Sequence, residues 1–109
     1  MANTFKLKTK ANVGVTTVGI YTAPASTTTV VIGITLSNTS GSGVNVGVGI
    51  TRAGTTEDVK LLKNAPIPSG SSLEFMSGNK IVLETSDQIN VDSDTNNSID
   101  AALTIMEIT

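Results

Sequence analysis

Residues 28–51 decide the fold of this chain: they read TTVVIGITLSN (28–38), TSGSG (39–43) and VNVGVGIT (44–51). In the first run apolar side chains recur at every second position from Val30 to Leu36, and in the last run they recur from Val44 to Ile50. A period of two places these side chains on one face of an extended strand. The Ser and Gly cluster between the runs is typical of a turn. The stretch therefore predicts two strands that each bury one face.

The same pattern continues on both sides of this stretch, in runs at 4–9, 13–21, 59–62, 73–75, 81–83, 89–91 and 99–108. Turn-forming residues separate the runs, with a rigid two-proline connection at 66–72 and a hairpin-like turn at 77–79. No window has the period of an amphipathic helix. We expect an all-β fold: a single-domain antiparallel β-sandwich, jelly-roll-like, with about eight or nine short strands. A closed barrel is the alternative.

The alternation also predicts which side chains form the core. The expected members are Val30, Ile32, Ile34, Leu36, Val46, Val48, Leu61, Leu73, Phe75, Ile81, Leu83, Ile89 and Leu103. Val31 joins them if both faces of the 28–38 run are covered. Phe5 is expected to be buried as well, which leaves Tyr21 alone and provides no aromatic platform for sugars or single-stranded nucleic acid.

The composition excludes several classes of function. The chain has 109 residues with a net charge of -2, and it contains neither Cys nor His. It therefore has no disulfide framework, no thiolate or imidazole metal site and no Ser–His or Cys–His nucleophile pair. A slightly acidic chain argues against general nucleic-acid binding, and the longest apolar run, at 30–36, is far shorter than the roughly 20 residues of a membrane span. We expect no enzyme, no cofactor, no nucleic-acid partner and no membrane.

Two groups of carboxylates are candidate sites. The loop from Asp92 to Asp100 begins like a calcium loop, but Asn97 stands where the sharp turn needs Gly and Leu103 stands where a bidentate Glu should close the site. A polar hairpin loop is the alternative that we favour. Glu57 and Asp58 are adjacent, and neighbours along a strand point to opposite faces, so they do not form a catalytic pair. We predict no metal site and no catalytic residues.

Lys6, Lys8 and Lys10 form a one-sided basic ridge if the N-terminal segment is extended. One interpretation is a docking strip for an acidic partner surface. The other is that lysines on an edge strand discourage edge-to-edge aggregation. We divide the chain into residues 1–12, an N-terminal strand or docking arm, and residues 13–109, the β-sandwich domain. The three lysines are the candidate partner-binding residues.

Several segments resemble small virion structural proteins of tailed bacteriophages. They are YTAPASTTTVV (21–31), LSNTS (36–40), KNAPIPSGSSLE (63–74), GNKIVLE (78–84) and DQINV (87–91), and the resemblance spans roughly residues 18–108. In these segments a Pro-Ser-Gly turn precedes one strand, and Gly-Asn-Lys forms a turn that reverses the chain direction before the next strand. The resemblance implies a β-sandwich that decorates the capsid or lies in the neck, tail or fibre. It supplies no catalytic residues.

These considerations predict a non-enzymatic bacteriophage virion structural protein, a capsid decoration (cement) protein by preference. We expect it to self-associate, as a trimer by preference, and to bind other virion proteins such as the major capsid protein. It would belong to the virion, which is assembled in the host cytoplasm. The alternatives are a tail, neck or fibre-attachment component and, from a different class, a host-surface or glycan-binding module. An enzyme ranks last.

Overall fold

The structure is a computed structural model that describes residues 2–54, 57–75 and 80–109. Within these residues the chain forms strands and turns and no helix, as the alternating pattern predicts. The strands are β1 (Asn3–Val13), β2 (Val18–Thr22), β3 (Thr28–Asn38), β4 (Val44–Thr51), β5 (Asp58–Ile67), β6 (Ser72–Phe75), β7 (Ile81–Leu83), β8 (Gln88–Ser93) and β9 (Ile99–Ile108).

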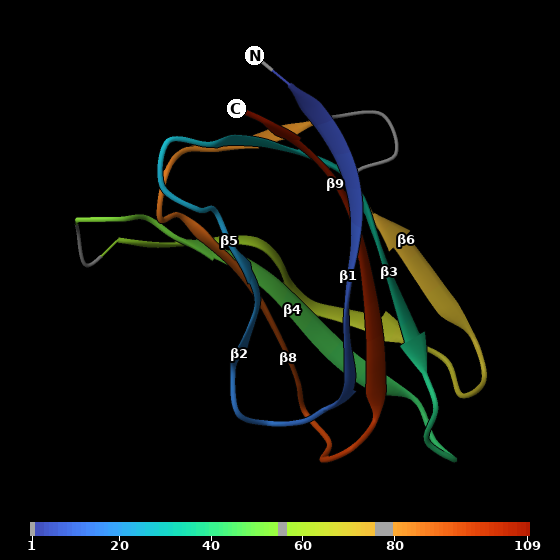
Figure 1. The fold of residues 1–109 in the computed structure, drawn as a ribbon. Coiled ribbons are helices and arrows are strands. Elements are labelled where there is room, and N and C mark those ends of the chain that lie inside the picture. Colours follow the sequence, from blue (N-terminus) through green and yellow to red (C-terminus); the bar gives the residue numbers. More distant parts are fainter. Residues whose placement is uncertain (1, 55–56, 76–79) are drawn as a thin grey trace.

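The strands form two antiparallel sheets that pack face to face (Figure 1). The larger sheet has the order β1-β9-β3-β6, with β7 also paired to β3, and the smaller sheet has the order β2-β8-β4-β5. If β6 and β7 are taken as two halves of one strand, most successive strands cross from one sheet to the other. That connectivity, with eight strands in two sheets, is that of a jelly roll. The predicted jelly-roll-like sandwich is confirmed, and the closed barrel is not formed.

The predicted hairpin between 73–75 and 81–83 is wrong. Both β6 and β7 pair antiparallel with β3, so they run in the same direction, end to end: Phe75 lies opposite Ile34 and Ile81 lies opposite Val31. The proposed turn residues, 77–79, lie outside the described residues. The predicted connection at 66–72 also begins later than expected, because Pro66 lies within β5 and pairs with Asn45. Proline is tolerated there because β5 is an edge strand.

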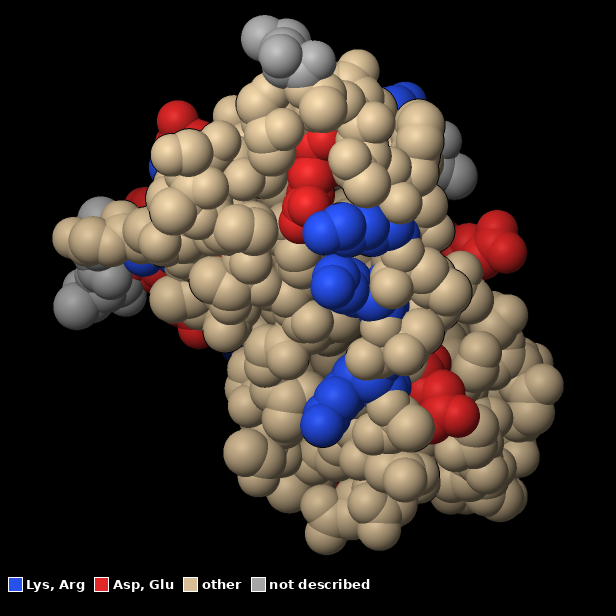
Figure 2. All heavy atoms as spheres, viewed as in Figure 1, with Lys and Arg blue, Asp and Glu red and all other residues tan. Residues whose placement is uncertain are grey.

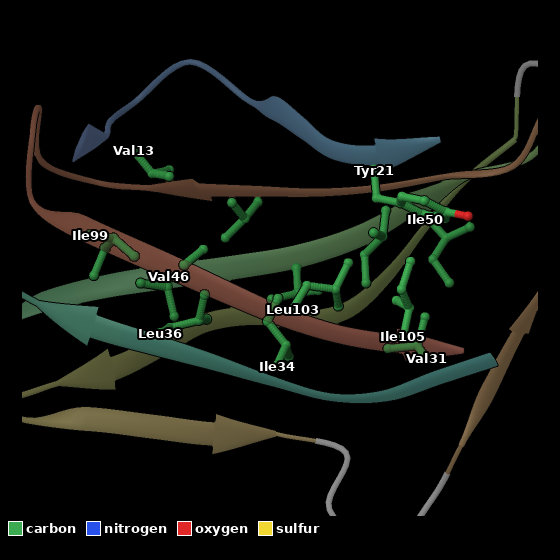
Figure 3. Close-up of a cluster of buried hydrophobic side chains, with 14 of the residues drawn as sticks. Val13, Tyr21, Val31, Ile34, Leu36, Val46, Ile50, Ile99, Leu103 and Ile105 are labelled. Atoms are coloured by element: carbon green, nitrogen blue, oxygen red, sulfur yellow. The ribbon is translucent and has the colours of Figure 1, made fainter. Parts of the chain in front are cut away.

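The core lies between the sheets and consists mostly of aliphatic side chains, with Tyr21 among them (Figure 3). Of the predicted members, Ile34, Leu36, Val46, Val48, Leu83, Ile89 and Leu103 are buried, and Leu61, Leu73, Phe75 and Ile81 are partly buried against them. Val30 and Ile32 are not core residues. Val31 pairs with Ile105 and Gly33 with Thr104, so β3 carries one extra residue at Ile32. This β-bulge reverses the inward phase: Val31 is buried before it and Ile34 after it.

The prediction that Phe5 is buried is also wrong, since Phe5 is 70% exposed. Its strand lies at the edge of the larger sheet, and the register with β9 places Phe5 opposite Met106 on the outer face. The next residue, Lys6, lies opposite the buried Ile105 and therefore on the inner side. The chain thus places lysines, not aromatic side chains, along the inner side of this edge.

Candidate docking surface

The three candidate lysines lie on β1, an edge strand of the larger sheet. β1 pairs with β9 from Asn3, opposite Ile108, to Val13, opposite Ile99, with an irregularity after Lys10, and no other strand of the described residues pairs with it. Lys6, Lys8 and Lys10 alternate with outward side chains, so all three lie on the inner side of the edge. Figure 2 shows them as a column of basic side chains over β1. The structure therefore brings the three predicted residues together on one ridge.

Lys6 is part of a network that reaches into the core. Its Nζ lies 2.8 Å from Oε1 of Glu107, a residue that is only 6% exposed. Oε2 of Glu107 accepts a hydrogen bond from the Tyr21 hydroxyl at 2.6 Å, and that hydroxyl lies 2.7 Å from Oγ1 of Thr29. The network joins β1, β9, β2 and β3. Lys6 therefore neutralises a buried carboxylate in addition to any role on the surface.

The network shifts the pKa values of both acidic members. The ion pair with Lys6 and the hydrogen bond from Tyr21 hold the pKa of Glu107 below its ordinary value, against the opposing effect of burial, and the charge of Lys8 adds to this. Burial and the hydrogen bond to Glu107 raise the pKa of Tyr21 to about 12. Glu107 is therefore ionised and Tyr21 is protonated near neutral pH. Neither group is poised for proton transfer.

Lys8 and Lys10 differ from Lys6. Within the described part of the chain, neither ammonium group has a carboxylate within 4.0 Å. Lys10 is exposed and Lys8 is half-buried at the margin of the sandwich. Their charges remain available to an acidic surface placed against β1.

A second charged cluster, which the sequence analysis missed, lies at one end of the sandwich. Arg52 contacts Glu84 at 2.6 Å and the buried Asp87 at 3.2 Å, and Asp87 also accepts hydrogen bonds from the backbone amides of Ala53 and Glu84. Burial alone would raise the pKa of Asp87, but the two amides and the guanidinium outweigh it, and the net pKa is lowered. The cluster ties the end of β4 to the segment between β7 and β8.

This cluster borders an apolar hollow of about 440 Å³, whose walls are Ile50, Val59, Leu61, Ile81 and Val82. The charged groups at its rim, Arg52, Glu84 and Asp87, are engaged with one another. A catalytic cleft needs a nucleophile or a titratable group aimed at the substrate. The described residues around this hollow present neither.

The carboxylates considered in the sequence analysis do not converge. Asp92 accepts a hydrogen bond from Thr17, Asp94 from the amide of Asn45, and Asp100 from the amide of Asn12. Each therefore braces a different segment. Asp58 lies at the start of β5, 4.0 Å from Lys60. Among residues 2–54, 57–75 and 80–109 no group of three acidic side chains is placed to hold a metal ion.

The sequence of β9 carries a signal for Glu107. Inward positions of β9 follow the alternation Ile99, Ala101, Leu103 and Ile105, and the next member of that series is Glu107. An acid in an otherwise apolar series implies a buried charge, which needs a basic partner. The lysines of β1 supply it, but the pairing of β1 with β9 has to be known first.

Comparisons with known proteins show the fold. No family model matches the chain, and no curated protein sequence matches it. A protein of the Bacillus endospore appendages, described as a family of disulfide-linked pili, is similar over 99% of this chain and 87% of its own, with a TM-score of 0.59 and 14% identity. A protein of the T13 viral particle of IBDV is similar over 96% of this chain, with a TM-score of 0.60 and 15% identity.

Two differences from these neighbours are plain. This chain spans 30% of the IBDV chain. It contains no cysteine, so it cannot form disulfide links of the kind named for the pili. What is shared is the fold. In the described residues no helix has the length and apolar character needed to cross a membrane.

Proposed function

We propose that this chain is a non-enzymatic structural subunit of a bacteriophage particle, and within that class a capsid decoration protein. It would bind the major capsid protein as a homo-oligomer, a trimer by preference, on particles assembled in the host cytoplasm. The observation that carries the proposal is the edge strand β1, on which Lys8 and Lys10 lie without carboxylate partners among the described residues. Residues 1–12 would form the docking strand and residues 13–109 the sandwich body.

The physical argument concerns what such an edge can do. An edge strand presents unpaired backbone groups, and lysines along it repel a second copy of the same strand. The same lysines attract an acidic surface and accelerate its encounter with β1. The ridge therefore favours a different, acidic partner over indiscriminate pairing. The occurrence of this fold in a viral particle protein and in a pilus protein supports a role in an assembly.

The test is to measure the number of copies bound to particles that lack the protein. The variant Lys8→Gln with Lys10→Gln removes the two unpaired charges and leaves the Lys6–Glu107 pair intact. We expect weaker binding, roughly two- to fivefold for each lysine, and a smaller dependence of binding on salt. Lys60→Gln with Lys63→Gln, on β5 of the other sheet, is the control with the same change in charge. Equal binding by the two double variants would contradict docking through β1.

A further inference from the structure

The strand register aligns four apolar side chains across the outer face of the larger sheet. Phe5 on β1 lies opposite Met106 on β9, Met106 lies opposite Val30 on β3, and Val30 lies opposite Val82 on β7. We call these four residues, with Leu7 beside Phe5, the outer apolar row. The bulge at Ile32 contributes to it, because it is the bulge that turns Val30 outward.

The outer apolar row is open to solvent. Phe5, Leu7 and Val82 are 70%, 64% and 56% exposed, and Met106 and Val30 are half-buried. The outward positions around the row, from residues 3–7 of β1, 104–108 of β9 and 28–30 of β3, carry no charged side chain. All the lysines of β1 are on its other side. The outer apolar row is therefore neutral on β1, β9 and β3, whereas Glu74, opposite Thr35, and Asp100, opposite Ser37, lie further along the same outer face.

The outer face of the smaller sheet is different. Its central strand, β8, presents Gln88, Asn90 and Asp92 outward, and these lie over glycines of the neighbouring strands. A Cβ atom at Gly47 would lie only 2.6 Å from Oδ1 of Asp92, so the polar side chain occupies the space that the glycine leaves. One outer face is thus covered by polar side chains of its own sheet, whereas the other leaves its apolar row uncovered.

We propose that the outer apolar row is a self-association surface, which packs against the same row of a second copy of this chain. The part of the outer apolar row on β1, β9 and β3 is complementary to itself, because two copies packed there bring no like charges together and leave no buried charge unpaired. Sheets pack face to face through such surfaces at a separation of about 10 Å. A surface that packs against the same surface of a second copy is related to it by a two-fold axis. This contact therefore forms a dimer, and it is separate from the contact that would form the trimer proposed above.

The size of the face sets the strength of the contact. Four strands about 4.8 Å apart, over about 20 Å of their length, give a face of roughly 400 Å², which includes the polar side chains of Asn3, Thr28 and Thr104 beside the row. The largest apolar patches on monomers measure about 300–600 Å², and a stable interface buries about 800 Å² on each partner. We therefore expect weak association in solution, with a Kd of about 0.1–1 mM. The contact becomes effective when an assembly holds several copies close together.

Sedimentation equilibrium tests this surface without any particle, from about 10 µM to about 1 mM protein. We expect the average mass to rise above the 11.2 kDa of the monomer, and the association to persist or strengthen at high salt. Phe5→Ser with Leu7→Ser should weaken association at least about tenfold. Val82→Ser, at the other end of the row, should also weaken association. It tests the row independently, because Val82 lies on a different strand.

Val15→Ser is the matched control, because Val15 is also 56% exposed but lies in the connection between β1 and β2. It should associate like the unmodified chain. A mass that stays at 11.2 kDa over the whole range would overturn the proposal, and so would association that Val15→Ser weakens as much as Val82→Ser does. Because the lysine-dependent docking proposed above weakens with salt and is measured on particles, the failure of one proposal is distinguishable from the failure of the other.

Discussion

At the scale of single residues, the carboxylate of Glu107 links β1 to the core. It is buried, it accepts a hydrogen bond from Tyr21, and it is neutralised by Lys6. A buried charge is tolerated when it is paired and hydrogen-bonded, and the loss of its partner is costly. The network therefore makes the attachment of β1 to the sandwich sensitive to pH at both extremes.

Glu107→Gln should lower stability near neutral pH and have little effect in acid. The folded state holds the pKa of Glu107 below its ordinary value, so the ionised group stabilises the fold above the unfolded pKa of about 4.3 and this contribution is lost as pH falls through the folded pKa. Urea unfolding at about pH 7 and about pH 3 measures this. If the variant and the parent differ in free energy of unfolding by the same amount at both pH values, the result would contradict the network.

Tyr21 gives the corresponding result in alkali. It is the only Tyr and there is no Trp, so an ultraviolet titration reports this one hydroxyl. We expect ionisation at about 12 in the folded chain. The folded pKa is raised, so the contribution to stability is complete below the unfolded pKa of about 10 and is lost as pH rises towards the folded value. Titration at about 10 in a chain that remains folded would place Tyr21 in solvent.

At the scale of strands, the bulge in β3 explains both what the sequence predicted and what it did not. The run 28–38 was recognisable as a strand because its period is two. The sequence does not show which alternate set of side chains points inward. Val30, Val31 and Ile32 are consecutive, apolar and β-branched, so each of the two alternate sets contains apolar residues at this point. The inward phase changes from Val31 to Ile34 only through pairing with β9, which is distant in the sequence.

A pair of substitutions tests this phase. Ile34→Ala should cost about 2–5 kcal/mol, since Ile34 is fully enclosed in the core. Ile32→Ala, the same change two residues away at the bulge, should cost less than about 1 kcal/mol, because Ile32 is half-exposed. Chemical denaturation gives both values. Equal losses, or the larger loss at Ile32, would show that the bulge is misplaced.

Deletion of residues 2–10 tests the division of the chain into a docking strand and a sandwich body. We expect the remaining chain to fold, because the core side chains begin at Val13. We also expect a lower Tm, because β9 loses one of its two neighbouring strands and Glu107 loses Lys6. Circular dichroism during heating measures both properties. Complete loss of the strand signal at room temperature would make β1 part of the folding unit, and an unchanged Tm would contradict its described pairing.

At the scale of the whole molecule, the strand count and the two-layer class followed from local patterns, whereas the strand order and the connection between β6 and β7 did not. Order depends on pairs such as β1 with β9, whose residues are about a hundred positions apart, and no local pattern encodes them. The features of the candidate surface also fall into those that the local sequence predicts and those that depend on strand pairing. The lysine ridge was visible as an alternation, but the Glu107 network and the outer apolar row appear only when the register joins distant strands.

The fold should not depend on metal ions. The carboxylates of the Asp92–Asp100 loop are directed at separate backbone and hydroxyl donors, so removal of divalent ions by a chelator should leave the Tm unchanged. The control is the same thermal scan with added calcium. A rise of several degrees with calcium would indicate a site that binds the folded state.

The central claim is that this chain is a stoichiometric part of a particle's outer shell. The most direct measurement is quantitative mass spectrometry of purified, intact bacteriophage particles from infected cells that produce the chain, with the major capsid protein as the internal standard. The account predicts that the chain co-purifies with the particles in copies on the order of hundreds, in a fixed ratio to the shell subunit. Its absence from intact particles would contradict a virion role, and about a dozen copies or fewer would contradict decoration of the capsid and indicate the tail or neck.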